Sequence, residues 1–309
     1  IILIGTNPRY EATILNSRIR KAYLKNNTKI YSLGEIGEIT YPYRAFENST
    51  KIIHAIINDK HELSKILKES KKPMFIIGQS VLKLNSSAYI FEELKKYLLK
   101  NNKINDDWNS LNILSNNAST VGSYDLNILS SKNGKNITLE KIKKNEFDVI
   151  FLFGQENLQF KKNKEFIIYI GSHGDRGAEM ADIILPGSSY TEQDGYFTNL
   201  EGKIQKAYKA SFPPGEAKED WQIVNELSAS LKRKLLYSNK EELINSMINY
   251  LNLYKDKKDF DLPKYEFIDE KINVDVLDYY HSNSIARASK TMTECKNLIS
   301  NIKKTGTDG

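Results

Sequence analysis

Short runs of apolar, often β-branched residues recur along the first two thirds of the chain, and most of them end at a glycine. The first run, residues 1–4, ends at Gly5, and the second ends at Gly34. Unbroken apolar runs of this length are typical of strands that are buried on both faces of a parallel sheet. The pattern predicts strands at residues 1–4, 29–33, 74–77, 149–153, 166–170 and 183–185.

Between these runs, apolar positions recur every three or four residues, as they do along one face of a helix. Asn7 suits the N-cap of the first helix and Pro8 suits its first turn. Helices are predicted at residues 8–23, 49–57, 61–69, 86–99, 108–119, 220–231, 239–254 and 284–302. Strands alternating with helices predict an α/β fold of mostly parallel sheets with helices on both faces, followed by a helical C-terminal extension.

The domain organisation is expected to follow this order of elements, since a chain of 309 residues suggests about two domains. We predict a Rossmann-like βα domain at residues 1–70 that lacks its N-terminal part, and a second α/β domain with glycine-rich loops at 71–235. A helical and linker extension is predicted at 236–309, with the charged residues 255–270 as the linker. Because the chain opens inside a βα pattern, we expect another polypeptide to supply its missing edge.

The composition excludes several classes of site. The net charge is +6, and Cys295 is the one cysteine, expected to be a small buried apolar residue. One cysteine excludes an intrachain disulfide, a zinc ribbon and an iron–sulfur cluster held by this chain alone. Lysines are interleaved with acidic residues, as at 60–62 and 218–220, so no nucleic-acid partner is expected. No apolar run approaches the roughly 18 residues of a membrane span, so no direct membrane insertion is expected.

Residues 5–9, Gly-Thr-Asn-Pro-Arg, lie where the first strand leads into a helix. Backbone N–H groups at such a corner can bind phosphate, but an ordinary strand-to-helix turn has the same spacing. The dinucleotide fingerprint G-x-G-x-x-G and the Walker A motif are both absent. The corner is therefore a candidate anion site whose spacing alone does not distinguish it from a structural turn.

Residues 171–179, Gly-Ser-His-Gly-Asp-Arg-Gly-Ala-Glu, follow a predicted strand and form a second candidate. His173 could act as a general base and Arg176 as an anion clamp. The structural alternative is an ion pair between Asp175 and Arg176, and the spacing does not decide between the two. In residues 191–202, Glu192, Asp194 and Glu201 could be acid/base groups, but such a glycine-punctuated polar run is more often a turn whose side chains bond their own backbone.

The segment 279–289 combines two tyrosines with a helix start and follows the charged linker. It is a candidate docking arm for a partner, with Tyr279, Tyr280, Ser284, Ile285 and Arg287 as its contact residues. The alternative is a helix that folds back on its own domain. The linker before it favours the partner interpretation.

Several motifs, in one order along the chain, resemble the large iron–sulfur subunit of the peripheral arm of respiratory complex I. These are Leu-Ile-Gly-Thr-Asn-Pro-Arg-Tyr-Glu-Ala at 3–12, His-Gly-Asp-Arg-Gly-Ala at 173–178, Met-Ala-Asp-Ile-Ile-Leu-Pro-Gly at 180–187, Pro-Pro-Gly at 213–215 with Glu-Asp-Trp at 219–221, and Ser-Ile-Ala-Arg-Ala-Ser at 284–289. The last motif is typical of this G-type subunit. The resemblance implies a molybdopterin-oxidoreductase-like fold.

The resemblance also implies an inactive version of a pterin guanine dinucleotide site. It would be lined by Gly5, Thr6, Asn7, Pro8, Arg9, His173, Gly174, Asp175 and Arg176. Active relatives carry Asp-Pro-Arg after the second strand, whereas this chain has Glu35 and Glu38 there without Pro-Arg. We therefore expect an empty cleft, no catalytic residue, no metal ligand and no activity from this chain alone.

In the family, 2Fe–2S and 4Fe–4S clusters belong to an N-terminal part that this sequence does not include. The expected role is a structural domain of proton-pumping NADH:ubiquinone oxidoreductase that supports that iron–sulfur part. Its expected partners are other peripheral-arm subunits, on the matrix side of the mitochondrial inner membrane. The alternatives are a fragment of an active molybdopterin guanine dinucleotide oxidoreductase and a stand-alone nucleotide-binding module.

Overall fold

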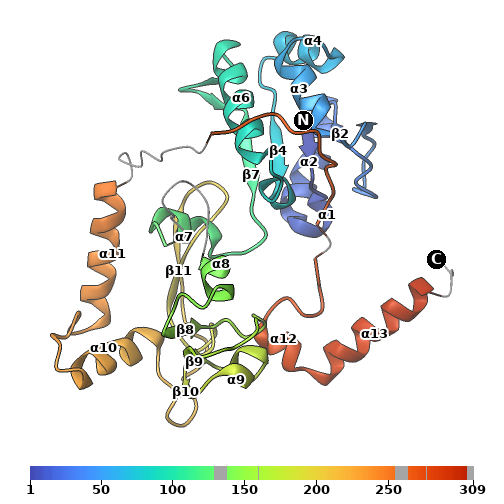
Figure 1. Ribbon diagram of the computed structural model, residues 1–309. Coiled ribbons are helices and arrows are strands. Elements are labelled where there is room, and N and C mark those ends of the chain that lie inside the picture. The colour runs from blue at the N-terminus through green and yellow to red at the C-terminus, as the bar shows by residue number, and fades with distance from the viewer. Residues whose placement is uncertain (129–137, 159, 255–263, 276, 305–309) are drawn as a thin grey trace. The chain divides into compact units, whose positions relative to one another are not determined.

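The chain folds into two compact units in a computed structural model that describes residues 1–128, 138–158, 160–254, 264–275 and 277–304 (Figure 1). Unit 1 comprises Ile1–Thr120 and the described part of Phe260–Leu277. Unit 2 comprises the described parts of Val121–Asp259 and Asp278–Gly309. The chain therefore leaves unit 1 after residue 120 and returns to it for one short segment before ending in unit 2.

Unit 1 is built on a parallel sheet with the strand order β3-β2-β1-β4-β7. Its strands are β1 (Ile2–Ile4), β2 (Tyr31–Leu33), β3 (Arg44–Phe46), β4 (Phe75–Gly78) and β7 (Leu111–Leu114). The three strands predicted in this part of the chain are confirmed, and β3 was not predicted. Since β1 pairs with β2 on one side and β4 on the other, the chain reverses its direction across the sheet between β1 and β4.

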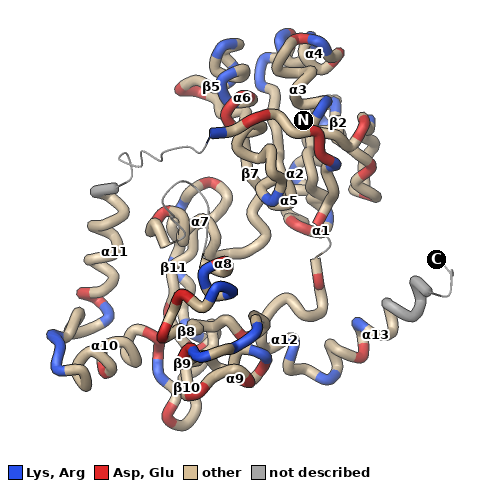
Figure 2. Tube along the Cα trace, in the orientation of Figure 1, with Lys and Arg blue, Asp and Glu red and all other residues tan. Residues whose placement is uncertain are grey.

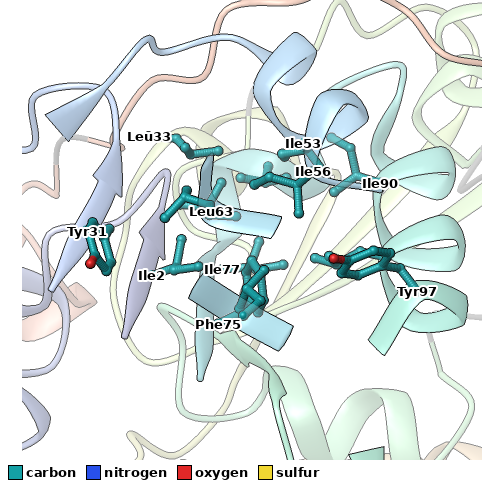
Figure 3. Packing of buried hydrophobic residues seen from close by; sticks show 14 of the residues in the cluster. Ile2, Tyr31, Leu33, Ile53, Ile56, Leu63, Phe75, Ile77, Ile90 and Tyr97 are labelled. Atoms are coloured by element: carbon teal, nitrogen blue, oxygen red, sulfur yellow. The ribbon is translucent and has the colours of Figure 1, made fainter. Parts of the chain in front are cut away.

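Both faces of this sheet are covered. Ile2 and Ile4 of β1 belong to one buried cluster, while Leu3 between them belongs to the other, because alternate strand residues point to opposite faces. Figure 3 shows the first cluster, in which Ile53 and Ile90 pack over the sheet. The helices of unit 1 are α1 (Pro8–Glu11), α2 (Thr13–Asn26), α3 (Thr50–Ile57), α4 (Glu62–Glu69), α5 (Gln79–Leu82) and α6 (Ser87–Lys100).

The helix predicted at residues 108–119 is wrong. Residues 108–109 form the short strand β6 (Trp108–Asn109), which pairs with β5 (Ile104–Asn105), and β7 follows. The Trp108 indole N–H and the Ser110 hydroxyl both donate to the Pro73 carbonyl, at 2.8 and 2.7 Å. These contacts hold the segment beside β4, where pairing with β4 outweighs local helical spacing.

The predicted domain boundary near residue 70 falls inside unit 1, because β4 pairs with β1 across it. The predicted linker at 255–270 lies partly outside the described residues. Its described part, from residue 264, is not a free linker. Thr50 donates a side-chain hydrogen bond to the Ile268 carbonyl at 2.8 Å, and Ile272 just beyond is 3% exposed. Charged composition suggested a linker, but specific contacts fix this segment to unit 1.

Unit 2 contains a parallel sheet with the order β10-β9-β8. The strands β8 (Val149–Phe153), β9 (Phe166–Gly171) and β10 (Ile183–Pro186) confirm the three predictions for this part of the chain. Ile142 of α8 (Thr138–Lys143) and Ala178 of α9 (Arg176–Met180) pack with the inward residues of β8 and β9. These short helices cover one face of the sheet.

The rest of unit 2 is helical, apart from an antiparallel hairpin of β11 (Gly195–Thr198) and β12 (Ile204–Ala207) that was not predicted. Its helices are α7 (Thr120–Asp125), α10 (Asp220–Ser230), α11 (Lys240–Tyr254), α12 (Ser284–Ala288) and α13 (Lys290–Lys304). The predicted helix at 284–302 is therefore two helices, separated at Ser289. The predicted domain boundary near residue 236 lies inside unit 2. A hydrogen bond crosses it, from the Asn225 side chain of α10 to the Tyr237 carbonyl just before α11.

Candidate functional site

The corner after β1 has the predicted N-cap. The Asn7 side chain accepts a hydrogen bond from the Arg9 N–H at 3.0 Å, and Pro8 occupies the first position of α1. Gly5 has a positive φ of 61° and fits against Ser80, whose hydroxyl donates to the Gly5 carbonyl at 2.7 Å. The sequence thus predicted the local conformation of this corner correctly.

One N–H group of the corner, that of Asn7, already bonds to a carboxylate. Glu11, at the end of the single-turn helix α1, accepts the Asn7 backbone N–H at 2.8 Å. Burial raises the pKa of Glu11, and Asp275 raises it further, against the effect of the Asn7 N–H. A carboxylate of the chain itself therefore bonds an N–H group that a phosphate at this corner would use.

The loop after β2 covers the same corner. The Asn7 side-chain amide donates to the Ile36 carbonyl at 2.6 Å, and Arg9 forms an ion pair with Glu38 at 2.5 Å. Glu35 accepts a hydrogen bond from Tyr43 within the same loop. A pyrophosphate would need free N–H donors and a free cation, but here the Asn7 N–H and the Arg9 guanidinium are already paired with carboxylates of the chain. The residues at this corner do not fit an anionic dinucleotide.

In the second candidate loop, Asp175 is the N-cap of α9 and its carboxylate accepts the Arg176 backbone N–H at 2.8 Å. The Arg176 side chain is exposed and makes no ion pair with Asp175 among the described contacts. Tyr169 donates to the His173 carbonyl at 2.7 Å, and the His173 ring lies 2.9 Å from the Ser172 hydroxyl. In place of the Asp175–Arg176 ion pair that the structural alternative offered, Asp175 forms a helix cap.

Asp175 instead pairs with Arg287 of α12. The Arg287 guanidinium lies 3.3 Å from the Asp175 carboxylate and 3.0 Å from that of Glu156. A hollow of about 300 Å³ adjoins this ion pair and is also lined by His173 and His281. Burial, with the nearby Glu156 and Asp175 carboxylates, raises the pKa of Tyr169 to about 12. This arrangement holds α12 against the β8–α9 end of its own unit.

The predicted docking residues thus differ in their surroundings. Arg287 is bonded within unit 2, as the folding-back alternative expects. Tyr279 is 80% exposed and Ile285 is also exposed, while Tyr280 and Ser284 are half-buried. Docking through the exposed pair stays a prediction.

The predicted cleft residues divide between the units. Residues 5–9 belong to unit 1 and residues 173–176 to unit 2, so neither unit alone holds the whole predicted cleft. Sequence reasoning missed Glu11 as the partner of the Asn7 N–H. The signal available was an acidic residue in the first turn after a capping asparagine, a position that the helix dipole favours.

The remaining candidates have structural surroundings. Glu192 accepts the N–H of nearby Ser189, as in a local turn, whereas Asp194 accepts the N–H of Lys209, 15 residues along the chain and beyond the predicted turn. Cys295 is half-buried on α13 rather than fully buried. Among the described residues, no group of three His, Cys, Asp or Glu side chains is placed to hold a metal ion. Along the traced chain, basic and acidic positions are interspersed in both units (Figure 2).

Known proteins extend this description. A model of the molybdopterin oxidoreductase family matches residues 1–230, and a model of the C-terminal region of the NADH-ubiquinone oxidoreductase G subunit matches residues 258–295. The "NADH-ubiquinone oxidoreductase 75 kDa subunit" of Reclinomonas americana is 38% identical over 311 residues, covering 96% of this chain and 44% of that protein. The G subunit of NADH-quinone oxidoreductase from Rickettsia bellii is 37% identical over 305 residues, covering 95% and 43%.

A third relative is the "NADH-ubiquinone oxidoreductase 78 kDa subunit, mitochondrial" of Candida albicans, 37% identical over 240 residues that cover 77% of this chain and 32% of the relative. The chain therefore spans less than half the length of each of these relatives. It belongs to the molybdopterin oxidoreductase family, as its motifs suggested, and over most of its length it is similar to G-type subunits of NADH-ubiquinone oxidoreductase.

Proposed function

We propose that this chain is a structural, cofactor-free part of proton-pumping NADH:ubiquinone oxidoreductase, in the peripheral arm of complex I. The three relatives named above are, according to their names, subunits of NADH-ubiquinone or NADH-quinone oxidoreductase, and this chain matches them along 77–96% of its length. Since it spans less than half of them, the iron–sulfur electron-transfer part is assigned to another segment or chain.

The observation that carries the cofactor-free assignment is the bond from the Asn7 N–H to the Glu11 carboxylate. A helix N-terminus binds phosphate through N–H groups that have no other partner. At this corner that N–H has an anionic partner, and Arg9 is paired with Glu38. A second anion would meet two carboxylates, so the corner favours a structural role.

The proposed partners are other peripheral-arm subunits and the polypeptide segment that carries the 2Fe–2S and 4Fe–4S clusters. The proposed location is the matrix side of the mitochondrial inner membrane, which the mitochondrial name of the Candida relative supports. No helix in the described part of the chain is long and apolar enough to cross a membrane. Tyr279 and Ile285 remain the proposed docking residues, since both are exposed.

The second candidate is a fragment of an active molybdopterin guanine dinucleotide oxidoreductase, which the family match over residues 1–230 favours. That function requires an open anion site at the corner after β1. The Glu11 carboxylate and the Arg9–Glu38 ion pair oppose it.

Affinity isolation of the full chain from its own cells tests the proposal. We expect it to bring down chains with NADH:ubiquinone reductase activity, one of which carries the cysteine motifs for iron–sulfur clusters. The double variant Tyr279→Ala, Ile285→Ala should reduce recovery of those chains. The control Tyr10→Ala changes an exposed tyrosine of the other unit, unit 1, and should not reduce recovery. Isolation of the chain alone, monodisperse and folded, would contradict the assembly.

A further inference from the structure

Residues 264–275, which we name the strap, lie across the carboxyl ends of the strands of unit 1. The Ile272 N–H donates to the Asn48 carbonyl at 2.8 Å, just after β3. The Thr50 hydroxyl donates to the Ile268 carbonyl and accepts the Glu270 N–H at 2.9 Å. Asp269 accepts from the Ser49 hydroxyl at 2.8 Å. The strap is therefore fixed along the start of α3.

Glu270 attaches the strap to a second helix, at the start of α6, which packs on the same face of the sheet as α3. Its carboxylate accepts hydrogen bonds from the Ser86 N–H and hydroxyl at 2.8 and 2.9 Å, and from the Asn85 N–H and side-chain amide at 3.1 and 3.0 Å. Although burial opposes it, these donors hold the pKa of Glu270 below its ordinary range. Ser86 precedes a helix of 14 residues, so the carboxylate lies at a favourable place for an anion.

Ile272 follows Glu270 by two residues along the strap. In the strand order β3-β2-β1-β4-β7 the chain reverses direction at β1 and β4, and ligands of open α/β sheets bind outside the carboxyl ends at such a reversal. Gly5 follows β1 at this point, and a Cβ placed on it would lie 3.3 Å from a methyl carbon of Ile272. Ile272 is 3% exposed and belongs to the core cluster of β1 and β4. An apolar side chain of the strap thus fills the crevice.

The ends of the strap continue the same contacts. Val274 packs against the second core cluster, and Asp275 pairs with Lys83 just after α5 at 2.7 Å. Phe267 stacks on His54 of α3 with ring centres 4.3 Å apart. The strap therefore alternates apolar residues that enter the unit with carboxylates that reach donors on its rim, which is how a groove holds an extended peptide.

We propose that the carboxyl-edge crevice of unit 1 is a peptide site whose resident ligand is the strap of the same chain. Ile272 fills the crevice and Glu270 is the anion at α6, while Glu11 is the anion at α1. This inference deepens the proposed function and rests on it, since it names what occupies the crevice in place of a dinucleotide. The strap also lies within residues 258–295, the stretch similar to the C-terminal region of the G-type subunits.

Hydrogen exchange of the full chain, followed by mass spectrometry, tests the proposal. Glu270→Gln and Ile272→Ala remove one attachment each, and the controls Glu266→Gln and Asn273→Ala make the same kinds of change at exposed positions of the strap. In both strap variants the backbone amides at 264–275 and 5–7 should exchange about tenfold faster or more. Each substitution removes contacts that raise the free energy of local opening, the bonds of a carboxylate to several donors in one variant and the burial of an isoleucine in the other. The controls should stay within about twofold of the parent.

The exchange rate of the β4 amides at 75–77 distinguishes a strap that opens separately, like a bound peptide, from a strap that unfolds together with the sheet. We expect them to stay protected in both strap variants. Acceleration of β4 to the same extent, or unchanged exchange at 5–7 when the strap itself exchanges faster, would overturn the peptide site. Unchanged exchange of the strap would overturn it as well. A chain that shows the expected exchange yet isolates without complex partners would contradict the proposed function alone.

Discussion

Asn7 uses both ends of its side-chain amide within unit 1. Its oxygen caps α1 through the Arg9 N–H, and its nitrogen donates to the Ile36 carbonyl of the loop after β2. The residue is 3% exposed, so neither group has water as an alternative partner. One residue thus joins the β1–α1 corner to the loop that covers it.

Replacing Asn7 by alanine should lower the free energy of unfolding of unit 1 by about 2–4 kcal/mol, since a cap is lost and a buried carbonyl loses its donor. Urea denaturation in a Trp221→Phe background measures this, because Trp108 then reports on unit 1 alone. Asn26→Ala, at an exposed residue of α2, is the control and should change stability by less than about 0.5 kcal/mol. If the two variants lost the same free energy of unfolding, Asn7 would not stabilise the corner through its cap and its bond to Ile36.

Glu11 gives unit 1 a pH dependence whose sign follows from its raised pKa. A carboxyl group with a higher pKa in the folded chain binds its proton more tightly when folded. Stability therefore falls as the pH rises from the unfolded pKa through the folded pKa. Glu11→Gln should make unit 1 more stable than the parent at pH 7. The difference should vanish below about pH 4, where the parent is protonated in both states.

Denaturation curves from pH 4 to 7, again followed by Trp108, check this difference. Glu69→Gln, at an exposed glutamate of the same unit, controls for the loss of one charge. A Glu11→Gln variant less stable than the parent at pH 7 would mean that the charge of Glu11 is needed at the Asn7 N–H.

At the scale of single residues, the sequence predicted the cap and the proline of α1 because those signals are local. The partners of Arg9 and Arg287 were not predictable, since Glu38 and Glu156 lie 29 and 131 residues away along the chain. The motif around Arg287 suggested docking, but only the fold places that side chain between two carboxylates of its own unit.

Among the elements, β1, β2, β4, β8, β9 and β10 were predictable because each is a short, mostly apolar run with a glycine at or just after its end, whereas β3 and β7 lack that pattern. The glycines also have a structural role where β1 and β4 end. A Cβ on Gly78 would lie 2.1 Å from the Gly5 carbonyl oxygen, a backbone atom. The two strand ends therefore approach each other more closely than any side chain allows.

Gly78→Ala should destabilise unit 1 by about 3 kcal/mol or more, because a packed backbone has no room to move aside. Thermal unfolding of the full chain, with exchange at β4 as the local readout, measures the effect. Gly174→Ala is the matched control, since no atom lies within 4 Å of its Cβ position. A Gly78 variant with unchanged β4 protection would contradict the close approach.

The ion pairs of Arg287 with Glu156 and Asp175 join helix α12 to the loops after β8 and before α9. Arg287→Ala should lower the free energy of local opening of α12 by about 2 kcal/mol, because two half-buried carboxylates lose their partner. Exchange at residues 284–288 measures the loss, and Lys290→Ala, at an exposed residue of α13, is the control. If both variants exchange alike, the ion pair does not hold α12.

Two elements could not be predicted from their own residues. Residues 108–114 have apolar positions that also fit a helix, and only the bonds to Pro73 beside β4 make them strands. The strap has the composition of a linker, and its contacts with Ser86 and Asn48 connect residues more than 180 positions apart. In both cases a distant part of the chain outweighs the local pattern.

For the whole molecule, the family and the α/β fold class were predictable because the motifs occur in one order and the strands have a clear pattern. The division into units was not, since residues 264–275 return to unit 1 after most of unit 2. At two of the helix starts on the carboxyl edge of unit 1, a carboxylate of the chain accepts backbone N–H groups. Glu11 does so at α1 and Glu270 at α6. These two contacts support the proposed scaffold role.

The measurement that tests this account most directly is the metal content of the assembly isolated with the full chain, determined by mass spectrometry and expressed per copy of the chain. The account predicts iron from the partner that carries the clusters, and molybdenum and tungsten at background. One molybdenum or tungsten per chain, retained together with a pterin dinucleotide, would contradict it.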